Sequence, residues 1–196
     1  MSHSLLDGSG DGYQMKIDSQ LRAYTNSIDQ SIESYYVNNG HAYAVNTGNI
    51  SLTSGNKSAL LYMLNNEDED IVISAFVFLL GNTTGGSGED ILVQIEKNPT
   101  GGTLISGGTA FDPINRDFGS ANTLSATILK GAEGSTLTGG TVAFQSLLTG
   151  VGRTPVVLQV VIPKGVSVGI TVTPPASNTS MNVQLATPLF LNKFNL

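Results

Sequence analysis

The chain of 196 residues contains no cysteine and no tryptophan, and its two histidines are His3 and His41. Without cysteine the protein has no disulfides, no thiolate ligands for zinc or iron–sulfur clusters, and no cysteine nucleophile. Charged residues make up only 12 % of the chain and apolar residues 40 %. Disordered chains are rich in charge and poor in apolar residues, so this composition predicts a folded domain with a substantial core.

Clusters of basic residues and long apolar runs are also missing. Nine Lys and Arg are spread thinly among fifteen Asp and Glu, for a net charge of −6. Because neutralising phosphates requires clustered Lys and Arg, we expect no direct binding to nucleic acid and none to a membrane. The longest apolar run, residues 71–81, is too short to span a bilayer and suits a strand buried on both faces. The N-terminus lacks the basic and apolar regions of a signal peptide, so none is expected.

Glycine is abundant, at 23 residues, and threonine and β-branched apolar residues accompany it. From residue 42 onward, short apolar segments alternate with turn signals at intervals of roughly 10 to 14 residues, with no helical segment between them. The pattern predicts an all-β protein, an antiparallel β-sandwich of the jelly-roll type over residues 41–196, with about nine or ten strands. Residues 103–111, 141–150 and 154–165 are each expected to form one strand.

Residues 1–40 are predicted to form an N-terminal arm that is extended or partly helical. Ile17, Leu21, Tyr24 and Ile28 follow helical spacing, but short alternating stretches in the same region are equally typical of a strand. The sequence therefore does not decide between a helix and a strand for this arm.

The segment of residues 163–191 is the best-patterned part of the chain, and it carries almost no reactive groups. Gly169 is expected in a tight strand, and Pro174 and Pro175 at the end of that strand, because proline donates no ladder hydrogen bond. Pro188 is expected to interrupt the last strand. The pattern of this segment therefore predicts strands and turns, and no reactive site.

Candidate catalytic and metal-binding residues are few. His41 is not accompanied by a G-x-S-x-G motif, so we expect a surface or turn histidine. The acidic run Glu67–Asp70 could attract Ca²⁺, yet it lacks the calcium-loop spacing, and side chains that point to alternating sides favour a solvated turn. A glycosidase needs two carboxylates across a cleft, and the loops offer four acids that the sequence cannot place: Asp90, Asp112, Asp117 and Glu133. The sequence predicts no catalytic, cofactor or metal site and a protein that is not an enzyme.

A chain this apolar and weakly charged would expose a sticky surface as a monomer. Burial of that surface between subunits resolves the difficulty, so we expect a homo-oligomer, with a trimer favoured. Tyrosine is a favoured interface anchor. Tyr24, Tyr35 and Tyr36 in the arm are therefore the candidate partner-binding residues.

Two long segments carry a resemblance to a known family: "GHAYAVNTGNISLTSGNKSALLYMLNNEDEDIVI" (residues 40–73) and "NPTGGTLISGGTAFDPINRDFGSANTLSATILKGAEGSTLTGG" (residues 98–140). Over most of its length the chain resembles auxiliary virion proteins of tailed bacteriophages, the decoration, cement or head-fibre proteins of the head. The resemblance implies a β-sandwich that oligomerises on or in a virus particle. It does not fix which part of the particle, and it assigns no site residues.

We therefore predict a structural virion protein, made in the host cytoplasm and placed on the capsid surface. As a capsid decoration or cement protein it would bind the major capsid protein and stabilise the head by non-covalent clamping, without cofactors. The alternative is a glycan- or receptor-binding module of a phage fibre or tail, since jelly rolls also serve as lectins. Its site would lie in the loops of residues 82–88 and 111–118, although the absence of tryptophan leaves few aromatic platforms for sugars.

Overall fold

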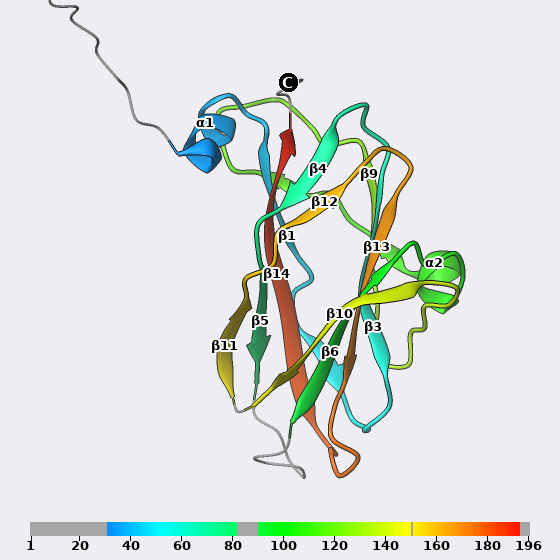
Figure 1. Cartoon of the computed structure of the whole chain (residues 1–196). Coiled ribbons are helices and arrows are strands. Elements are labelled where there is room, and N and C mark those ends of the chain that lie inside the picture. The colour runs from blue at the N-terminus through cyan, green and yellow to red at the C-terminus, as the bar shows by residue number, and fades with distance from the viewer. Residues whose placement is uncertain (1–30, 82–89, 150, 193–196) are drawn as a thin grey trace, which may run out of the picture. The chain divides into compact units, whose positions relative to one another are not determined.

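The computed structural model describes residues 31–81, 90–149 and 151–192. One compact unit begins at Ile32, and its described residues form two antiparallel β-sheets and two short helices (Figure 1). None of the described helices is long and apolar enough to cross a membrane.

The first sheet has the central order β11–β5–β14–β1–β8, and β2, β4 and β12 complete it in the described part of the chain. Its strands are β1 (Ala42–Asn46), β2 (Ile50–Leu52), β4 (Asp70–Ile73), β5 (Phe76–Leu80), β8 (Ile114–Asn115), β11 (Gly152–Val156), β12 (Val160–Ile162) and β14 (Met181–Asn192).

The second sheet has the order β10–β6–β13–β3–β9–β7. Its strands are β3 (Ser58–Asn65), β6 (Ile91–Lys97), β7 (Thr109–Ala110), β9 (Ala126–Lys130), β10 (Thr141–Leu148) and β13 (Ser167–Thr173). The helices are α1 (Ile32–Asn38), before the first strand, and α2 (Thr103–Gly107), between β6 and β7.

The order of the strands is that of a jelly roll. In the first sheet the first and last strands, β1 and β14, lie side by side and are followed by β5 and β11. In the second sheet β3, β13, β6 and β10 are nested in the same way. Two Greek keys produce this interleaving of early and late strands, and the strand pairs are antiparallel. The predicted all-β antiparallel jelly roll is confirmed.

The core lies between the two sheets and is filled by alternate residues of the strands. β14 alternates along its whole length, with Val183, Leu185 and Leu189 buried and their neighbours partly exposed. Phe76 and Phe78 of β5 are completely buried in the same cluster. Burying one such side chain contributes roughly 1.5–3 kcal/mol, so this layer is the main source of stability.

The apolar run of residues 71–81 forms two strands, so the prediction of one strand buried on both faces was wrong. β4 and β5 are separated by Ser74 and Ala75, and each pairs with a different part of β14. The change of partner falls beside Pro188, which has no backbone N–H to donate. The Thr187 hydroxyl donates a 2.7 Å hydrogen bond to the carbonyl oxygen of Ala75 at this point. β14 itself continues through Pro188, so the expected interruption falls in the neighbouring strand instead.

Two further segments differ from the prediction. The segment of residues 154–165 contributes to two strands, because β11 pairs with β5 and β12 with β4, and both follow the break between those strands. Residues 103–111 form α2 and the two-residue β7 instead of one strand. The helix buries Leu104 completely beside Ala59 and Tyr62, in a cluster separate from the main core, and this local burial favours the helical turn.

Two features near the C-terminus were predicted correctly. β13 ends at Thr173, immediately before Pro174 and Pro175. Gly169 lies inside β13, where a Cβ atom would come within 2.4 Å of Leu137 Cδ1. A larger residue at this position requires its neighbour to move.

Candidate interaction surfaces

One side of the sandwich ends in strands that, among the described residues, have a neighbour on one side only. β10 of the second sheet pairs with β6, while β11 and β12 of the first sheet pair with β5 and β4 (Figure 1). We call this side the open edge and define it as β10, β11, β12 and the described residues between them. Its strands present backbone N–H and C=O groups toward solvent.

The open edge also exposes apolar side chains. Scattered single examples are normal on a protein surface, whereas several on one side mark an interaction surface. Their exposed fractions range from 45 to 83 %, and they are Val142, Leu147, Val151, Val157 and Val161.

Charge is nearly absent from this part of the chain. Residues 134–163 contain a single charged side chain, Arg153. Edge strands usually carry charges, particularly lysine, which prevent other chains from pairing with them. β10 has the sequence TVAFQSLL and no charge at all. β10 therefore lacks the charges that usually protect an edge strand against pairing.

The register between β10 and β6 determines which face of the sheet each β10 side chain occupies. Phe144 and Leu148 lie opposite the buried Ile95 and Ile91, so they face the core. The exposed Leu147 lies opposite Leu92 on the outer face. A register shift near the start of β10 marks a β-bulge, a common feature of sheet edges.

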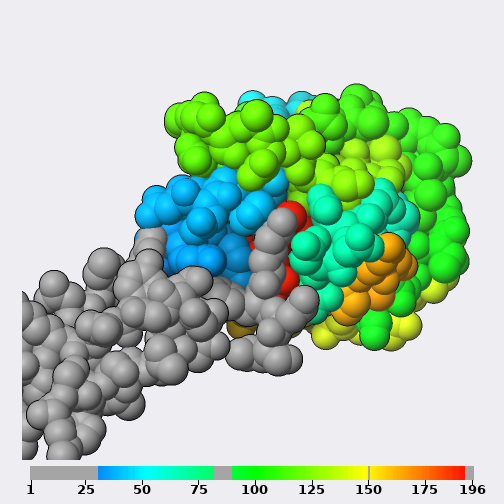
Figure 2. Space-filling model, turned by 90° about the horizontal axis from the view of Figure 1, so that it is seen from above, coloured from blue at the N-terminus to red at the C-terminus, as the bar shows by residue number. Residues whose placement is uncertain are grey.

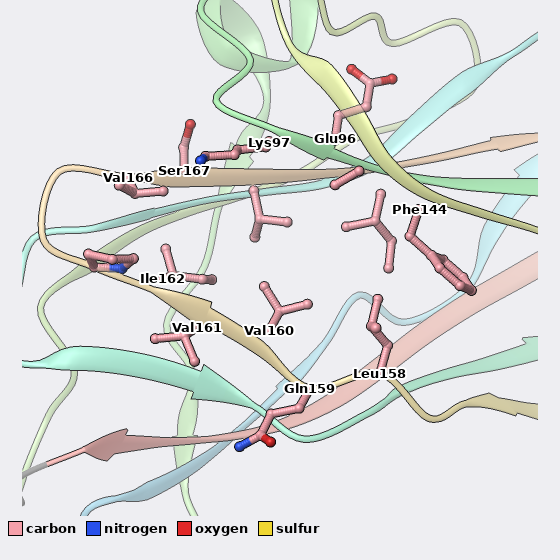
Figure 3. A pocket seen from close by; sticks show the side chains of 14 residues that line it. Glu96, Lys97, Phe144, Leu158, Gln159, Val160, Val161, Ile162, Val166 and Ser167 are labelled. Carbon is pink, nitrogen blue, oxygen red and sulfur yellow. The ribbon is translucent and has the colours of Figure 1, made fainter.

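A cavity of about 480 Å³ lies at the open edge, between β12 of the first sheet and β6, β10 and β13 of the second. Figure 3 shows Leu158, Val160 and Ile162 on one side of it and Phe144 on the other, while Gln159 and Val161 point away. Its lining is dominated by aliphatic and aromatic groups. Such a space accepts apolar side chains and offers little to an ion.

The opposite side of the sandwich is covered. β8 pairs with β1, and Arg116, which follows β8, donates a backbone hydrogen bond of 2.8 Å to the Ala42 carbonyl. The Tyr43 hydroxyl donates to the carbonyl of Thr123 at 3.2 Å. Figure 2 shows α1, in blue, next to the light-green loop that follows β8. We call α1, β1, β8 and residues 116–125 the covered edge.

Gly40 is the centre of a polar network at the covered edge. Its carbonyl oxygen accepts hydrogen bonds from the side-chain amides of Asn115, at 3.0 Å, and Asn122, at 3.2 Å. Its φ of +67° favours glycine, and a Cβ atom there would lie 2.3 Å from Ser120 Oγ. An ion pair between Arg116 and Glu33 ties the loop to α1.

The covered edge has its own exposed apolar side chains. Phe118 is 92 % exposed in the loop, and Ile32, Tyr35 and Ile114 are exposed in α1 and β8. The edge strand among them, β8, has only two residues, whereas β10 at the open edge has eight. The two edges therefore differ in backbone pairing more than in apolar exposure.

The three tyrosines predicted to bind a partner lie in different environments. Tyr24 lies outside the described residues. Tyr36 is 1 % exposed, stacks on Phe190 with ring centroids 4.6 Å apart, and donates a 3.0 Å hydrogen bond to Asn192 Oδ1. The sequence analysis named Tyr36 as a candidate partner-binding residue, but its ring packs inside the domain and is not exposed on the surface. Tyr35 is 40 % exposed and meets the Tyr36 ring edge-on.

This packing also places the start of the domain. The helix α1 contacts β1 and β14, and the compact unit begins at Ile32. Residues 32–40, which the sequence analysis assigned to the arm, thus belong to the packed unit.

The loop carboxylates considered for catalysis or calcium act as structural anchors where their contacts are described. Glu133 accepts hydrogen bonds from the hydroxyl and backbone N–H of Thr53, at 2.8 and 2.7 Å, and from the Ser54 hydroxyl at 3.0 Å. These hydrogen bonds, the one from the Thr53 hydroxyl above all, hold the pKa of Glu133 below its ordinary value.

The acidic run of residues 67–70 distributes its side chains over different partners. Asp68 forms an ion pair with Lys164, whose hydrogen bond lowers the pKa of Asp68 while its own pKa is raised by Asp68. Glu67 accepts a hydrogen bond from the backbone N–H of Ser125. Burial, with a smaller contribution from Glu67, raises the pKa of the nearby Tyr43.

His41 lies at the junction between α1 and β1. Its backbone N–H donates to the Tyr36 carbonyl at 2.8 Å, and its carbonyl accepts from the Leu191 N–H at 3.0 Å. Within the described ranges, no group of three or more His, Asp or Glu side chains could hold a metal ion.

One buried ion pair was not found from the sequence. Lys57 Nζ lies 2.7 Å from Glu96 Oε1, and Glu96 is only 4 % exposed although it belongs to β6, the partner of β10. Residues 139 and 140 pass over this site, since a Cβ atom at Gly140 would lie 3.2 Å from Glu96 Oε2. The alternation of β6 marks Glu96 as facing away from the core, but nothing in the sequence shows that a distant loop covers it.

No protein-family model matches the chain, and no curated protein matches it. Among solved structures, the chain is similar to a protein of the T=1 particles derived from infectious bursal virus, at 12 % identity and a TM-score of 0.19. The similarity covers 76 % of this chain and 39 % of the viral chain. At this TM-score the likeness does not establish a common fold.

Proposed function

We propose that the chain is a structural virion protein that decorates the head of a tailed bacteriophage. It binds the major capsid protein on the capsid surface and clamps neighbouring capsomers without covalent bonds. The observation that carries the proposal is the open edge, a weakly charged apolar side of a jelly roll where the described strand β10 has a neighbour on one side only. Together with the resemblance of residues 40–73 and 98–140 to phage head proteins, it favours a protein that works through contact surfaces.

Clamping of this kind depends on many contacts acting together. Burying a valine or leucine side chain is worth roughly 1.5–3 kcal/mol, whereas an association step costs about 4–15 kcal/mol. A capsid lattice offsets this cost, because a protein that touches two capsomers binds the second one at high effective concentration. A homo-oligomer, with the trimer as the favoured form, multiplies the contacts further.

The arm is the proposed docking segment for the capsid. Residues 1–30 lie outside the described residues, and Tyr35 in α1 is 40 % exposed. A truncation that tests the arm should end at residue 30. Removal of residues 1–36 would also delete the buried Tyr36 ring and so would confound docking with folding.

The test is a reconstruction of phage heads prepared without this protein and then mixed with it. We expect jelly-roll density on the outer capsid surface and release of packaged DNA at a higher temperature than from bare heads. The chain lacking residues 1–30 should keep its urea midpoint but fail to co-sediment with heads. If the full chain neither sediments with heads nor changes the release temperature, the decoration function is wrong.

Glycan or receptor binding is the second candidate, and the exposure of Phe118 favours it. A ring that is 92 % exposed in a polar loop can stack on the apolar face of a sugar. Phe111, at the start of the same region, packs against the core instead. The loop of residues 82–88 lies outside the described residues. A glycan array should then give hits that disappear with Phe118→Ala, and an array without hits for the intact chain rejects this candidate.

A further inference from the structure

We propose that the open edge is the surface through which copies of this chain bind one another, with β10 pairing against the open edge of a second copy. The inference deepens the proposed function, on which it rests for its biological purpose, by assigning the oligomer interface to particular residues. The occupant is a further copy of the chain.

β10 is the strand best suited to such pairing. It has eight residues, whereas the other described strands with one neighbour are shorter: β11 has five, β2 and β12 have three, and β7 and β8 have two. β11 also contains Pro155, which cannot donate a ladder hydrogen bond. After the bulge, β10 pairs regularly with β6 from Phe144 to Leu148. Its outer side thus presents a regular ladder to another strand.

Charge favours a second copy at this place. Two chains that each carry a net charge of −6 repel one another over most approaches. The open edge avoids this repulsion, since Arg153 is the one charged side chain within residues 134–163. Two copies that meet here bring together surfaces that each carry one charged side chain, so the repulsion between them is small.

The shape of the open edge supports the same occupant. The apolar cavity between β10 and β12 is concave, while Val157, between β11 and β12, is 83 % exposed beside it. A neighbouring copy therefore supplies both a strand for the ladder and apolar side chains for the cavity. The exposed Leu147 and Val142 lie on the outer face of β10, so a strand that pairs with β10 places its own side chains directly beside them.

The first experiment measures molecular mass in solution by light scattering. The intact chain should have a mass that is a multiple of 20.4 kDa. The variant Val142→Lys/Leu147→Lys places like charges across the interface, which should weaken self-association by at least about 100-fold and give a mass of 20.4 kDa. The matched control Ile114→Lys/Phe118→Lys alters exposed apolar residues at the covered edge and should leave the mass unchanged. An intact chain that stays at 20.4 kDa overturns the proposal. The open edge would then be left for a different occupant, such as a small apolar ligand or another protein.

A second experiment guards against loss of folding in the lysine variant. Because the chain has no cysteine, Leu147→Cys introduces a unique thiol into an otherwise unreactive protein. A flexible reagent that joins two thiols should link two chains of Leu147→Cys and should not link two chains of Ile114→Cys, because only Leu147 lies on the edge that the copies share. Equal cross-linking of both variants, or of neither, contradicts the proposal.

The two proposals fail in distinguishable ways. A chain that binds heads but stays monomeric, without cross-links at Leu147→Cys even on the particle, rejects the interface and retains the decoration function. A chain that self-associates through β10 but never joins heads does the opposite.

Discussion

The two edges of the jelly roll both expose apolar side chains, but they differ in how their strands are paired and covered. At the covered edge, β8 and the loop after it satisfy the outer side of β1, and Asn115, Asn122 and Arg116 fix that cover by hydrogen bonds and an ion pair. At the open edge, no described strand pairs with the outer side of β10. The same domain thus protects one edge thoroughly and leaves the other bare. This contrast is the basis of the proposal that the open edge binds another copy of the chain.

A comparison of β10 with β13 in the second sheet shows how position in a sheet decides whether a strand is exposed. β10 and β13 are both uncharged strands of similar length, TVAFQSLL and SVGITVT. β13 lies between β3 and β6 and is almost entirely buried, whereas most of β10 is exposed. Their composition is alike, so position in the sheet decides which becomes core and which becomes surface. Pairing with distant strands sets that position.

The largest expected effect tests whether α1 is part of the covered edge. Tyr36→Ala removes a buried ring that stacks on Phe190 and a hydrogen bond to Asn192. Removal of a large buried aromatic side chain costs about 3–5 kcal/mol, which urea denaturation should detect as a lower free energy of unfolding. Tyr35→Ala, beside it in the helix but 40 % exposed, is the matched control and should cost less than about 1 kcal/mol. Equal costs for the two variants would mean that α1 does not cover the edge.

The next effect concerns the strand that supports β10. Lys57→Ala leaves Glu96 of β6 without its ion-pair partner, and the Glu96 side chain is only 5 % exposed. Breaking a buried pair costs about 3–5 kcal/mol, and we expect about 2 kcal/mol because the Lys57 side chain is 44 % exposed.

The matched control for this pair is Lys164→Ala, which breaks the solvent-exposed pair with Asp68 and should leave the urea midpoint unchanged. Replacement of both Lys57 and Glu96 by methionine should recover most of the lost stability. A double variant as unstable as Lys57→Ala would show that the lost stability does not come from an unpaired Glu96 carboxylate.

A smaller effect tests why the open edge is divided into β11 and β12. The division follows the break between β4 and β5, where the Thr187 hydroxyl donates to the Ala75 carbonyl at 2.7 Å. Thr187→Val keeps the shape of the side chain but leaves that carbonyl unpaired, which should cost about 1–3 kcal/mol. Thr187→Ser keeps the hydroxyl and should cost less. If valine is as stable as serine at this position, the hydrogen bond does not hold the break together.

The sequence is informative where the pattern is local. The end of β13 before Pro174 and the place of Gly169 inside a tight strand were both predicted from nearby residues. The burial of Tyr36 could not be predicted in the same way, because its partner Asn192 is 156 residues away. The break after residue 73 likewise depends on where β14 changes partner.

The open edge is an intermediate case. The uncharged run of residues 134–163 is visible in the sequence and could have drawn attention to this region. Composition alone cannot tell an uncharged edge strand from an uncharged central strand, as β10 and β13 demonstrate. The sheet order supplies that distinction, and it arises from contacts between segments far apart in the chain.

The smallest expected effect is a pH dependence at the loop that follows β9. Three hydrogen bonds from Thr53 and Ser54 hold the folded-state pKa of Glu133 below its ordinary value of 4.5. A carboxyl group with a lowered folded pKa adds stability above the unfolded-state pKa, and that stability is lost as the pH falls through the folded pKa. Glu133→Gln should therefore be less stable than the parent chain at neutral pH, and urea midpoints measured at decreasing pH should converge below 4.5. A gap between parent and Glu133→Gln that stays constant across the pH range would show that the ionised carboxylate does not anchor this loop.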